Sequence, residues 1–255
     1  MRIAVITGAS SGMGREFVKQ IDAAESFDEI WVIARRKERL EELCEGAKNK
    51  IRPVPLDLMK RESFDEYKTL LESEKPNVAL LVNGSGFGRF GAFTDIDLDT
   101  QLDMIDLNDK ALVAMTYLTL PYMKEGGRIY QIDSLSSFQP VPYIGVYGAT
   151  KAFVLSYSRS LNRELRPRGI KVCAVCPGWV RTEFFDRAKT KNEKAVTYYN
   201  KVWESEDVVR TALRDAYKGK DVSIHGFSVK AQVFATKLLP HSLVMNIWLK
   251  QQGHK

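Results

Sequence analysis

The sequence predicts a doubly wound α/β fold, in which a parallel sheet of about seven strands has helices on both faces. Three observations predict this fold. Short apolar segments recur along the first two-thirds of the chain, and they are continuous, as in strands buried on both faces. Charged segments with helical spacing separate them, and a glycine-rich turn follows the first apolar segment. We expect a single domain over residues 1–255.

The candidate strands are these apolar segments. They comprise residues 3–6, 30–34, 78–82, 128–132 and 171–176, with a short last strand at 221–224. Residues 51–56 are a weaker candidate, because Pro53 and Pro55 interrupt them. Alternation of parallel strands with helices requires right-handed crossovers, which place helices against both faces of the sheet.

The candidate helices lie between and after the strands. They comprise residues 14–24, 36–47, 61–73 and 208–217. Residues 184–205 are polar and aromatic with no clear strand, which predicts a short helical insertion. The apolar C-terminal tail, residues 229–255, has apolar residues on both sides of Pro240, which predicts two helical pieces.

Composition and charge exclude several classes of protein. Hydrophobic residues make up 44% and charged residues 27%, as in a folded globule. The net charge is 38 − 32 = +6 and is spread along the chain, so we expect no nucleic-acid partner. Three cysteines are too few for a disulfide scaffold. The chain begins almost directly with a strand and has no apolar run of about 18 residues, so we expect a cytoplasmic protein.

The glycine-rich turn lies between the first strand and the first helix. Residues 7–14 have the sequence Thr-Gly-Ala-Ser-Ser-Gly-Met-Gly. Glycines permit a tight turn and let backbone N–H groups approach a pyrophosphate at a helix N-terminus. This position is typical of Rossmann-like dinucleotide folds. Turns and close helix–strand contacts also favour glycine, so the turn alone does not establish a nucleotide site.

The spacing Thr-Gly-x-x-x-Gly-x-Gly resembles the short-chain dehydrogenases/reductases (SDRs). The resemblance extends in motif order and spacing from residue 2 to 182, and beyond that only in general layout. It implies reversible carbonyl/alcohol interconversion with a nicotinamide cofactor, in a homodimer or homotetramer. It assigns the turn residues Gly8, Ser10, Ser11, Gly12, Met13 and Gly14 to the cofactor.

A tyrosine and a lysine, Tyr147 and Lys151, stand four residues apart at the start of a predicted helix. This spacing places them on one helix face. A nearby ammonium favours the ionised form of a phenol, whose free pKa is about 10, so such a tyrosine can donate or accept a proton. A chance pair on a solvated face is the alternative, and it would be preferred if the pair stood alone. The resemblance implies that Tyr147 is the acid/base and that Lys151 lowers its pKa and holds the cofactor ribose.

Ser134 lies just past the strand at 128–132, at the sheet edge where ligands bind in such folds. Its interval to Tyr147, 147 − 134 = 13, is similar to the Ser-to-Tyr spacing of the SDRs. The resemblance implies that Ser134 hydrogen-bonds the substrate oxygen and steadies Tyr147. Ser136 and Ser137 are nearby competitors.

Asn108 is the fourth candidate catalytic residue. It falls on an apolar stripe that we expect to face the core. The other members of the stripe are Leu102, Ile105, Leu112 and Met115. A buried amide needs hydrogen-bond partners, so Asn108 could be a satisfied core residue. The resemblance implies instead that it organises a water linked to Lys151 in a proton relay.

Three further segments are similar to cofactor-binding segments of the SDRs. They contain Asn83, Gly84 and Ser85, then Asp57 and Leu58, and finally Pro177, Gly178, Val180 and Thr182. The resemblance implies that the second segment holds the adenine and the third meets the nicotinamide carboxamide. Gly84 and Ser85 depart from the SDR pattern, while Asn83 fits a role in bracing the sheet.

The end of the second strand indicates the choice of cofactor. NAD-specific enzymes place a carboxylate there to bind the ribose hydroxyls, and this chain has Ala34 followed by Arg35 and Arg36. A guanidinium pairs with a 2′-phosphate. We expect NADP(H), with Arg35 as the leading phosphate partner and Ser10 assisting it. A basic helix start on a solvated face is the alternative, and Ser11 stands where many NADP-using relatives have a basic residue.

The substrate side of the site is less determined by the sequence. We expect residues 184–207 to cover the substrate, and the aromatic residues there and nearby hint at an apolar or ring-bearing compound. These residues are Phe184, Phe185, Tyr198, Tyr199, Trp203, Phe87 and Phe138. For the tail we favour packing within the chain or between subunits, while contact with a membrane or a cover over a lipid-like substrate is the alternative.

We expect no metal site. Cys173 and Cys176 have CxxC spacing but lie in a predicted buried strand, and His225, His241 and His254 are scattered. The sequence therefore predicts an NADP(H)-dependent oxidoreductase acting on a small carbonyl or alcohol. A non-catalytic NADP-binding sensor or scaffold, and an epimerase or dehydratase on a related fold, are the alternatives.

Overall fold

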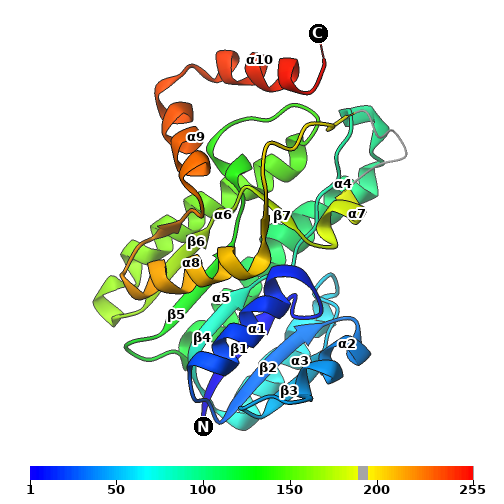
Figure 1. The fold of residues 1–255 in the computed structure, drawn as a ribbon. Helices are drawn as coiled ribbons and strands as arrows, with labels where there is room; N and C mark the ends of the chain where they lie inside the picture. Colours follow the sequence, from blue (N-terminus) through cyan, green and yellow to red (C-terminus); the bar gives the residue numbers. More distant parts are fainter. Residues whose placement is uncertain (189–194, 255) are drawn as a thin grey trace.

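The computed structural model describes residues 1–188 and 195–254. A parallel sheet of seven strands lies at its centre, in the order β3-β2-β1-β4-β5-β6-β9 (Figure 1). The strands are β1 (Arg2–Thr7), β2 (Glu29–Ala34), β3 (Ile51–Pro55), β4 (Asn77–Asn83), β5 (Arg128–Ile132), β6 (Lys171–Val175) and β9 (Val222–Ser223). The predicted doubly wound fold is therefore confirmed. Chain order reverses at β1, and the glycine-rich turn follows β1 at this switch point.

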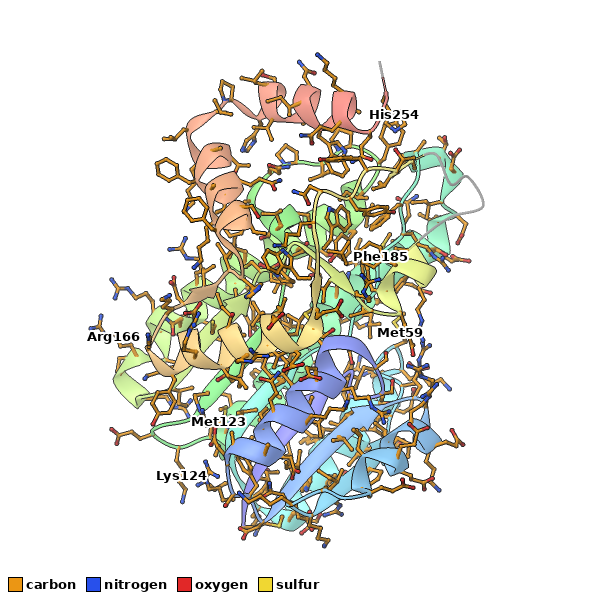
Figure 2. All side chains as sticks on the ribbon, viewed as in Figure 1. Met59, Met123, Lys124, Arg166, Phe185 and His254 are labelled. Atoms are coloured by element: carbon orange, nitrogen blue, oxygen red, sulfur yellow. The ribbon has the colours of Figure 1, made fainter. Side chains whose placement is uncertain are left out.

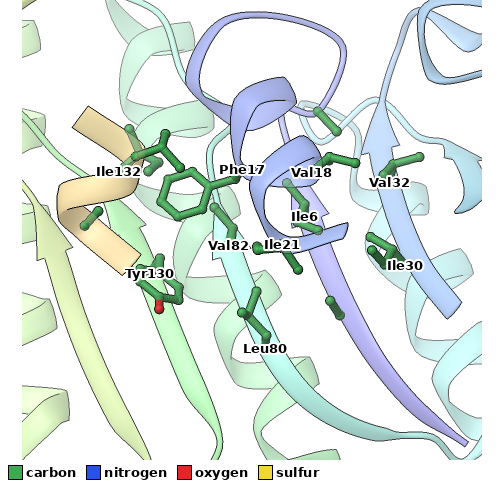
Figure 3. Packing of buried hydrophobic residues seen from close by; sticks show 14 of the residues in the cluster. Ile6, Phe17, Val18, Ile21, Ile30, Val32, Leu80, Val82, Tyr130 and Ile132 are labelled. Carbon is green, nitrogen blue, oxygen red and sulfur yellow. The ribbon is translucent and has the colours of Figure 1, made fainter. Parts of the chain in front are cut away.

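Helices cover both faces of the sheet. One face packs against α1 (Gly12–Ala24), α2 (Lys37–Glu41) and α8 (Ser205–Tyr217). The other packs against α3 (Arg61–Glu74), α5 (Ala111–Thr119) and α6 (Gly145–Glu164). Figure 3 shows Phe17 of α1 seated over the strands, and its ring lies 5.3 Å from that of Tyr130. Both faces of the strands are thus buried, which explains their continuous apolar sequences.

The weak strand candidate forms the sheet edge. β3 pairs only with β2, so its other side needs no ladder hydrogen bonds. Pro53 and Pro55 are tolerated there because proline lacks the N–H that a central strand would use. The helix expected over residues 36–47 is shorter than predicted, since α2 ends at Glu41 and a 3₁₀ turn follows over Glu42–Cys44.

The prediction that the stripe through Asn108 faces the core is wrong in its first half. Leu102 and Ile105 on α4 (Leu98–Ile105) are 50% and 44% exposed, whereas Leu112 and Met115 are buried. A π-helix over Asp106–Lys110 separates the two halves. Its wider turn inserts a residue, so a single α-helical period cannot run through it. Asn108 itself is buried within this π-helix.

The prediction of no strand within residues 184–205 is also wrong, whereas the short last strand predicted at 221–224 is present as β9. The short helix α7 (Phe184–Ala188) is followed by β8 (Val202–Glu204), which pairs in parallel with β7 (Trp179–Arg181). A strand this short has too few residues to show a period, so only its tertiary partner defines it. Part of the expected substrate cover, residues 189–194, lies outside the described residues.

The C-terminal tail forms two helices, α9 (Phe227–Leu238) and α10 (His241–Gln251), separated at Pro240 as predicted. Figure 1 shows α9 rising from the body of the protein and α10 crossing above it. Within residues 1–188 and 195–254, no helix is both long and apolar enough to cross a bilayer. One face of each tail helix turns toward the body, while Phe227, Phe234 and Leu238 on α9 are exposed.

Candidate active site

The glycine-rich turn packs so closely that side chains cannot fit at two of its positions. Gly8 has φ +68°, and a Cβ there would lie 2.5 Å from the Gly84 carbonyl group. A Cβ on Gly14 would lie 2.3 Å from the Gly8 oxygen. The Thr7 hydroxyl accepts hydrogen bonds from the backbone N–H groups of Gly84 and Ser85, at 3.0 and 3.2 Å. These contacts hold the turn against the end of β4, with the N-terminus of α1 opening beside it.

A cavity of about 510 Å³ extends from this turn to the tail helices. It brings together most of the predicted cofactor residues. Those lining it are Gly8, Ser10, Ser11, Gly12, Met13, Gly14, Arg35, Arg36, Asp57, Leu58, Gly84, Ser85, Pro177, Gly178, Val180 and Thr182. The glycine cradle at a helix N-terminus fits a pyrophosphate, because its backbone can be approached closely and the helix dipole favours an anion.

Asn83 lies outside this lining. Its side-chain amide donates to the hydroxyl of Thr116 and to the side-chain oxygen of Gln131, both at 2.9 Å. All three side chains are buried. Asn83 thus ties β4 to β5 and α5, which is the bracing role that the sequence suggested.

The arginines after β2 also lie at the cavity. Arg35 is exposed, and Arg36 donates from Nη2 to the Ser10 hydroxyl at 3.1 Å and to the Glu183 carboxylate at 3.0 Å. Arg36 is therefore already engaged by a carboxylate, whereas the Arg35 guanidinium is presented at the rim. Sequence reasoning missed Glu183, which lies far from the arginines along the chain.

The candidate catalytic residues meet at the middle of the cavity. Tyr147 and Lys151 lie one turn apart on the buried face of α6, at 8% and 6% exposure. Ser134 lies two residues past the end of β5, and its hydroxyl acts on the Tyr147 phenol and lowers its pKa. The Lys151 ammonium donates to the Ile132 carbonyl at 2.8 Å and lies 5.7 Å from the centre of the Tyr147 ring.

The competing serines have other positions. The Ser137 hydroxyl donates to the Ser134 carbonyl at 2.6 Å, and the Ser136 N–H donates to the Ser134 hydroxyl at 3.2 Å. Both residues therefore support the turn that presents Ser134. Of the three serines, Ser134 is the one whose hydroxyl acts on the Tyr147 phenol and lowers its pKa.

Asn108 is held by the chain itself. Its side-chain oxygen accepts from the Phe87 N–H at 3.0 Å, and its amide donates to the Phe87 carbonyl at 2.9 Å and to Thr150 at 3.1 Å. A Cβ on Gly86 would lie 2.8 Å from the Asn108 oxygen and 3.8 Å from the Lys151 nitrogen. Asn108 is thus a satisfied buried amide that fixes the loop after β4 beside Lys151.

Burial controls the electrostatics of this group. It raises the pKa of the Tyr147 phenol, while the hydrogen bond from Ser134 lowers that pKa and the charge of Asp133 raises it. Burial also lowers the pKa of Lys151, against the charges of Asp133 and Asp109. The phenol is therefore protonated at neutral pH and available as an acid.

Aromatic side chains surround the other side of Tyr147. The Phe184 ring lies 5.4 Å from the Tyr147 ring, and the Phe90 ring lies 6.5 Å from it. Phe87, Phe185 and Tyr198 also line the cavity. Tyr199 packs on Trp179 at 4.9 Å behind this wall, whereas Phe138 and Trp203 lie outside the cavity lining. Sequence reasoning missed Phe90 and Trp179.

The tail completes the cavity. Residues of α9, α10 and the bend between them line it, including Leu239, Val244 and Trp248. The Trp248 indole donates to the Pro142 carbonyl at 3.0 Å, and the ring of His254 stacks on that of Tyr143 at 4.0 Å. Figure 2 shows side chains filling the region between α10, which ends near His254, and the segment with Phe185. The tail therefore packs within its own chain.

The remaining cysteines and histidines form no metal cluster in the described part of the chain. The Cys176 thiol donates to the Asp133 carboxylate at 3.1 Å, and Cys173 lies in the core. His225 hydrogen-bonds Thr211 at 2.7 Å.

Comparison with known proteins identifies the family. The model of the short chain dehydrogenases matches residues 2–193. An uncharacterized oxidoreductase of Staphylococcus epidermidis is 31% identical over 183 residues, which is 71% of this chain and 79% of that protein. An uncharacterized oxidoreductase of Staphylococcus aureus is 27% identical over 90% of this chain and 96% of its own.

Solved structures agree with this match. The short-chain dehydrogenase from Sphingobium yanoikuyae in complex with NADPH superposes with a TM-score of 0.79 at 28% identity, covering 96% of this chain and 95% of its own. The bulky-bulky ketone specific alcohol dehydrogenase from Comamonas testosteroni has a TM-score of 0.73 at 27% identity, covering 93% and 92%. A family match over most of the chain, together with the glycine cradle and the Ser134–Tyr147–Lys151 group, shows that this chain belongs to the short-chain dehydrogenase/reductase family of NAD(P)(H)-binding oxidoreductases.

Proposed function

We propose that this protein interconverts a carbonyl and an alcohol with NADP(H), on an apolar or ring-bearing substrate. The observation on which this depends is the position of Tyr147, with Ser134 and Lys151 beside it in the lining, between two different parts of one cavity. Glycine backbone and arginines line one part, and aromatic and aliphatic side chains line the other. A nucleotide fits the first part and an apolar carbonyl compound fits the second.

In reduction, a bound NADPH supplies the hydride. The Ser134 hydroxyl orients the carbonyl oxygen through a hydrogen bond, and the Tyr147 phenol donates its proton to that oxygen. The raised pKa of Tyr147 keeps this proton in place until the oxygen gains negative charge. Lys151 places its positive charge beside the phenol and stabilises the phenolate that forms. In alcohol oxidation the same residues act in the reverse direction, and Tyr147 accepts the proton of the alcohol.

NADP(H) is proposed over NAD(H) because no carboxylate stands at the end of β2. Ala34 stands at the position where NAD-specific enzymes have the carboxylate that binds the ribose. Arg35, the next residue, is exposed and lines the cavity, where it can pair with a 2′-phosphate. The Sphingobium structure contains NADPH, and a serine dehydrogenase with a TM-score of 0.74 at 30% identity was solved with NADP⁺.

The substrate is proposed from the lining around Tyr147. Phe90, Phe184 and Trp248 offer apolar contact rather than charge. The name of the Comamonas relative specifies bulky ketones, whereas that of the serine dehydrogenase specifies a small polar substrate. The test of this assignment is a comparison of kcat/KM for aryl ketones with kcat/KM for small polar carbonyl compounds. Much more efficient turnover of the small polar compounds would reject the apolar assignment.

The reaction is tested with the Tyr147→Phe variant. Loss of the phenolic proton is expected to lower kcat by a factor of about 10²–10⁴ while NADPH binding, followed by fluorescence titration, stays intact. The rival function is a non-catalytic NADP-binding sensor or scaffold. That rival requires wild-type protein that binds NADPH but turns over none of the carbonyl compounds or alcohols.

We also propose that residues 1–255 form one domain that assembles as a homodimer or homotetramer. Leu98, Leu102 and Ile105 on α4 are exposed, and so is Phe153 on the neighbouring α6. Burial of such apolar side chains against a second copy is favourable. Light scattering after size-exclusion chromatography measures the assembly, and a mass of one chain at micromolar concentration would contradict it.

A further inference from the structure

One buried carboxyl beside the active site has no role in the mechanism above. Asp133 lies between the end of β5 and Ser134, and its exposure is 2%. Its Oδ2 accepts the Cys176 thiol at 3.1 Å, while its Oδ1 is buried with no hydrogen-bond partner among the described residues. Burial of a carboxylate with so few partners is costly, so a second interaction has to compensate for it. Asp133 lines the cavity together with Lys151.

A second carboxyl approaches the same lysine from another element. Asp109 lies on the π-helix, half-buried, and its Oδ1 also has no hydrogen-bond partner within the described part of the chain. Both Asp133 and Asp109 interact electrostatically with the buried Lys151 ammonium. The ammonium therefore faces two carboxyl groups, one from the sheet edge and one from the π-helix.

We propose that Asp133 is a positioning residue for Lys151: its carboxylate balances the ammonium charge and keeps the Tyr147 phenol in its proton-donating form. The inference depends on the function proposed above, in which Tyr147 is the acid. The Lys151 ammonium, held at the carbonyl of Ile132 next to Asp133, favours the phenolate, whereas the negative charge of a nearby carboxylate opposes this effect. Asp133 thereby extends to higher pH the range in which Tyr147 is the proton donor.

The surrounding groups support this balance. Burial raises the pKa of Asp133 to about 7, although the charge of Lys151 and the Cys176 thiol that donates to its Oδ2 lower it. The groups that face Lys151 are Asp133 after β5, Asp109 on the π-helix and Cys176 after β6. Those that act on Tyr147 are Ser134 and Asp133. The charge of Asp133 is thus the one carboxylate that influences both the lysine and the phenol in the described residues.

The test compares pH profiles of the wild type with those of Asp133→Asn, which keeps the side-chain shape and removes the charge. We expect the pH at which kcat/KM for alcohol oxidation rises to move down by about one unit, because the phenol ionises more readily. The alkaline fall of kcat/KM for ketone reduction should move down in parallel. Asp133→Ser should give the same shift, because it also removes the charge.

The matched control is Asp106→Asn, on the π-helix that contains Asp109. Asp106 forms an ion pair with Lys110 at 3.2 Å and does not act on Lys151. We expect its pH profile to coincide with that of the wild type. Lower activity in both Asp133 variants with unmoved pH limbs would show that the residue is only structural, and would overturn the proposal.

A second measurement needs no turnover. Infrared difference titration of the protein alone should show a protonated carboxyl band that disappears as the pH rises through about 7, and this band should be weaker in Asp133→Asn, in which Asp109 still contributes. A carboxyl of Asp133 that stays protonated into the alkaline range would overturn the inference, because it would have no charge to act on Lys151, while leaving the proposed reaction intact. Absence of any carbonyl turnover by the wild type would instead reject the proposed function, and this inference with it.

Discussion

The two ends of the cavity are built in different ways. The nucleotide end consists of backbone: positive φ values, glycines in contact and strand ends at the switch point, formed largely by residues 7–14 and 84–85. The substrate end consists of side chains from segments far apart in sequence, including Phe90, Phe184 and Trp248. Short-range geometry thus defines the first end, and long-range packing defines the second. Substitutions at the two ends should therefore differ in kind as well as in size.

The largest effect is expected at Gly8. In Gly8→Ala the new Cβ would clash with the Gly84 backbone at 2.5 Å, in addition to the strain of φ +68°. We expect a loss of at least about 3 kcal/mol in the free energy of unfolding, and loss of NADPH binding.

Gly46→Ala is the matched control. Gly46 has φ +70° with no atom within 4 Å of its Cβ position, so it reports the backbone strain alone, about 1–2 kcal/mol. Chemical denaturation measures both variants. Equal losses in the two would show that close packing of the turn is unimportant.

The next effect concerns the charge at the nucleotide end. Arg35→Asp should weaken NADPH binding by a factor of about 10–100, because a charge-assisted pair is replaced by repulsion, and NADH should then bind as well or better. Arg39→Asp makes the same charge change on α2 outside the cavity lining and should leave the ratio unchanged. Fluorescence titration with both nucleotides measures this. An unaltered NADPH preference in Arg35→Asp would make the phosphate assignment wrong.

A smaller effect is expected at the substrate end. Trp248→Ala removes a cavity-lining indole that also holds the Pro142 carbonyl, and should raise KM for bulky ketones several-fold with little change in NADPH affinity. Phe234→Ala removes a side chain of similar size that is 64% exposed on α9, and should leave KM unchanged. Steady-state kinetics compares them. If Trp248→Ala weakened NADPH binding instead, this result would contradict the claim that the two ends of the cavity bind different ligands.

The smallest effect is expected on stability, at Asp133 in the cavity lining beside Ser134. The pKa of Asp133 is raised to about 7 in the folded protein, so the folded state binds this proton more tightly than the unfolded state does. Stability from this group is therefore present below about pH 4 and is lost as the pH rises to 7. Asp133→Asn removes this loss, so its Tm should exceed that of the wild type by a few degrees at pH 7.5 and by less at pH 4. Calorimetry at the two pH values tests the sign.

The strands and the nucleotide end were predictable because their signals are local. Continuous apolar segments gave the core strands, and the turn at residues 7–14 gave the cradle, with Tyr147 and Lys151 one helical turn apart. The stripe through Leu102 and Ile105 predicted a buried face that does not exist, because a π-helix resets the helical period without a signature in composition. β8 was missed because it exists only through its pairing with β7.

The sequence by itself determined the fold, the cradle and the order of the candidate catalytic residues, since each depends on backbone conformation within a few residues. Tertiary structure alone decided which charges meet. It placed Glu183 on Arg36, brought Asp133 and Asp109 to Lys151, and folded α10 over the cavity. The physical reason is that electrostatic coupling and apolar packing depend on distance in space, and in an α/β fold the crossovers bring strand ends together whatever their separation along the chain.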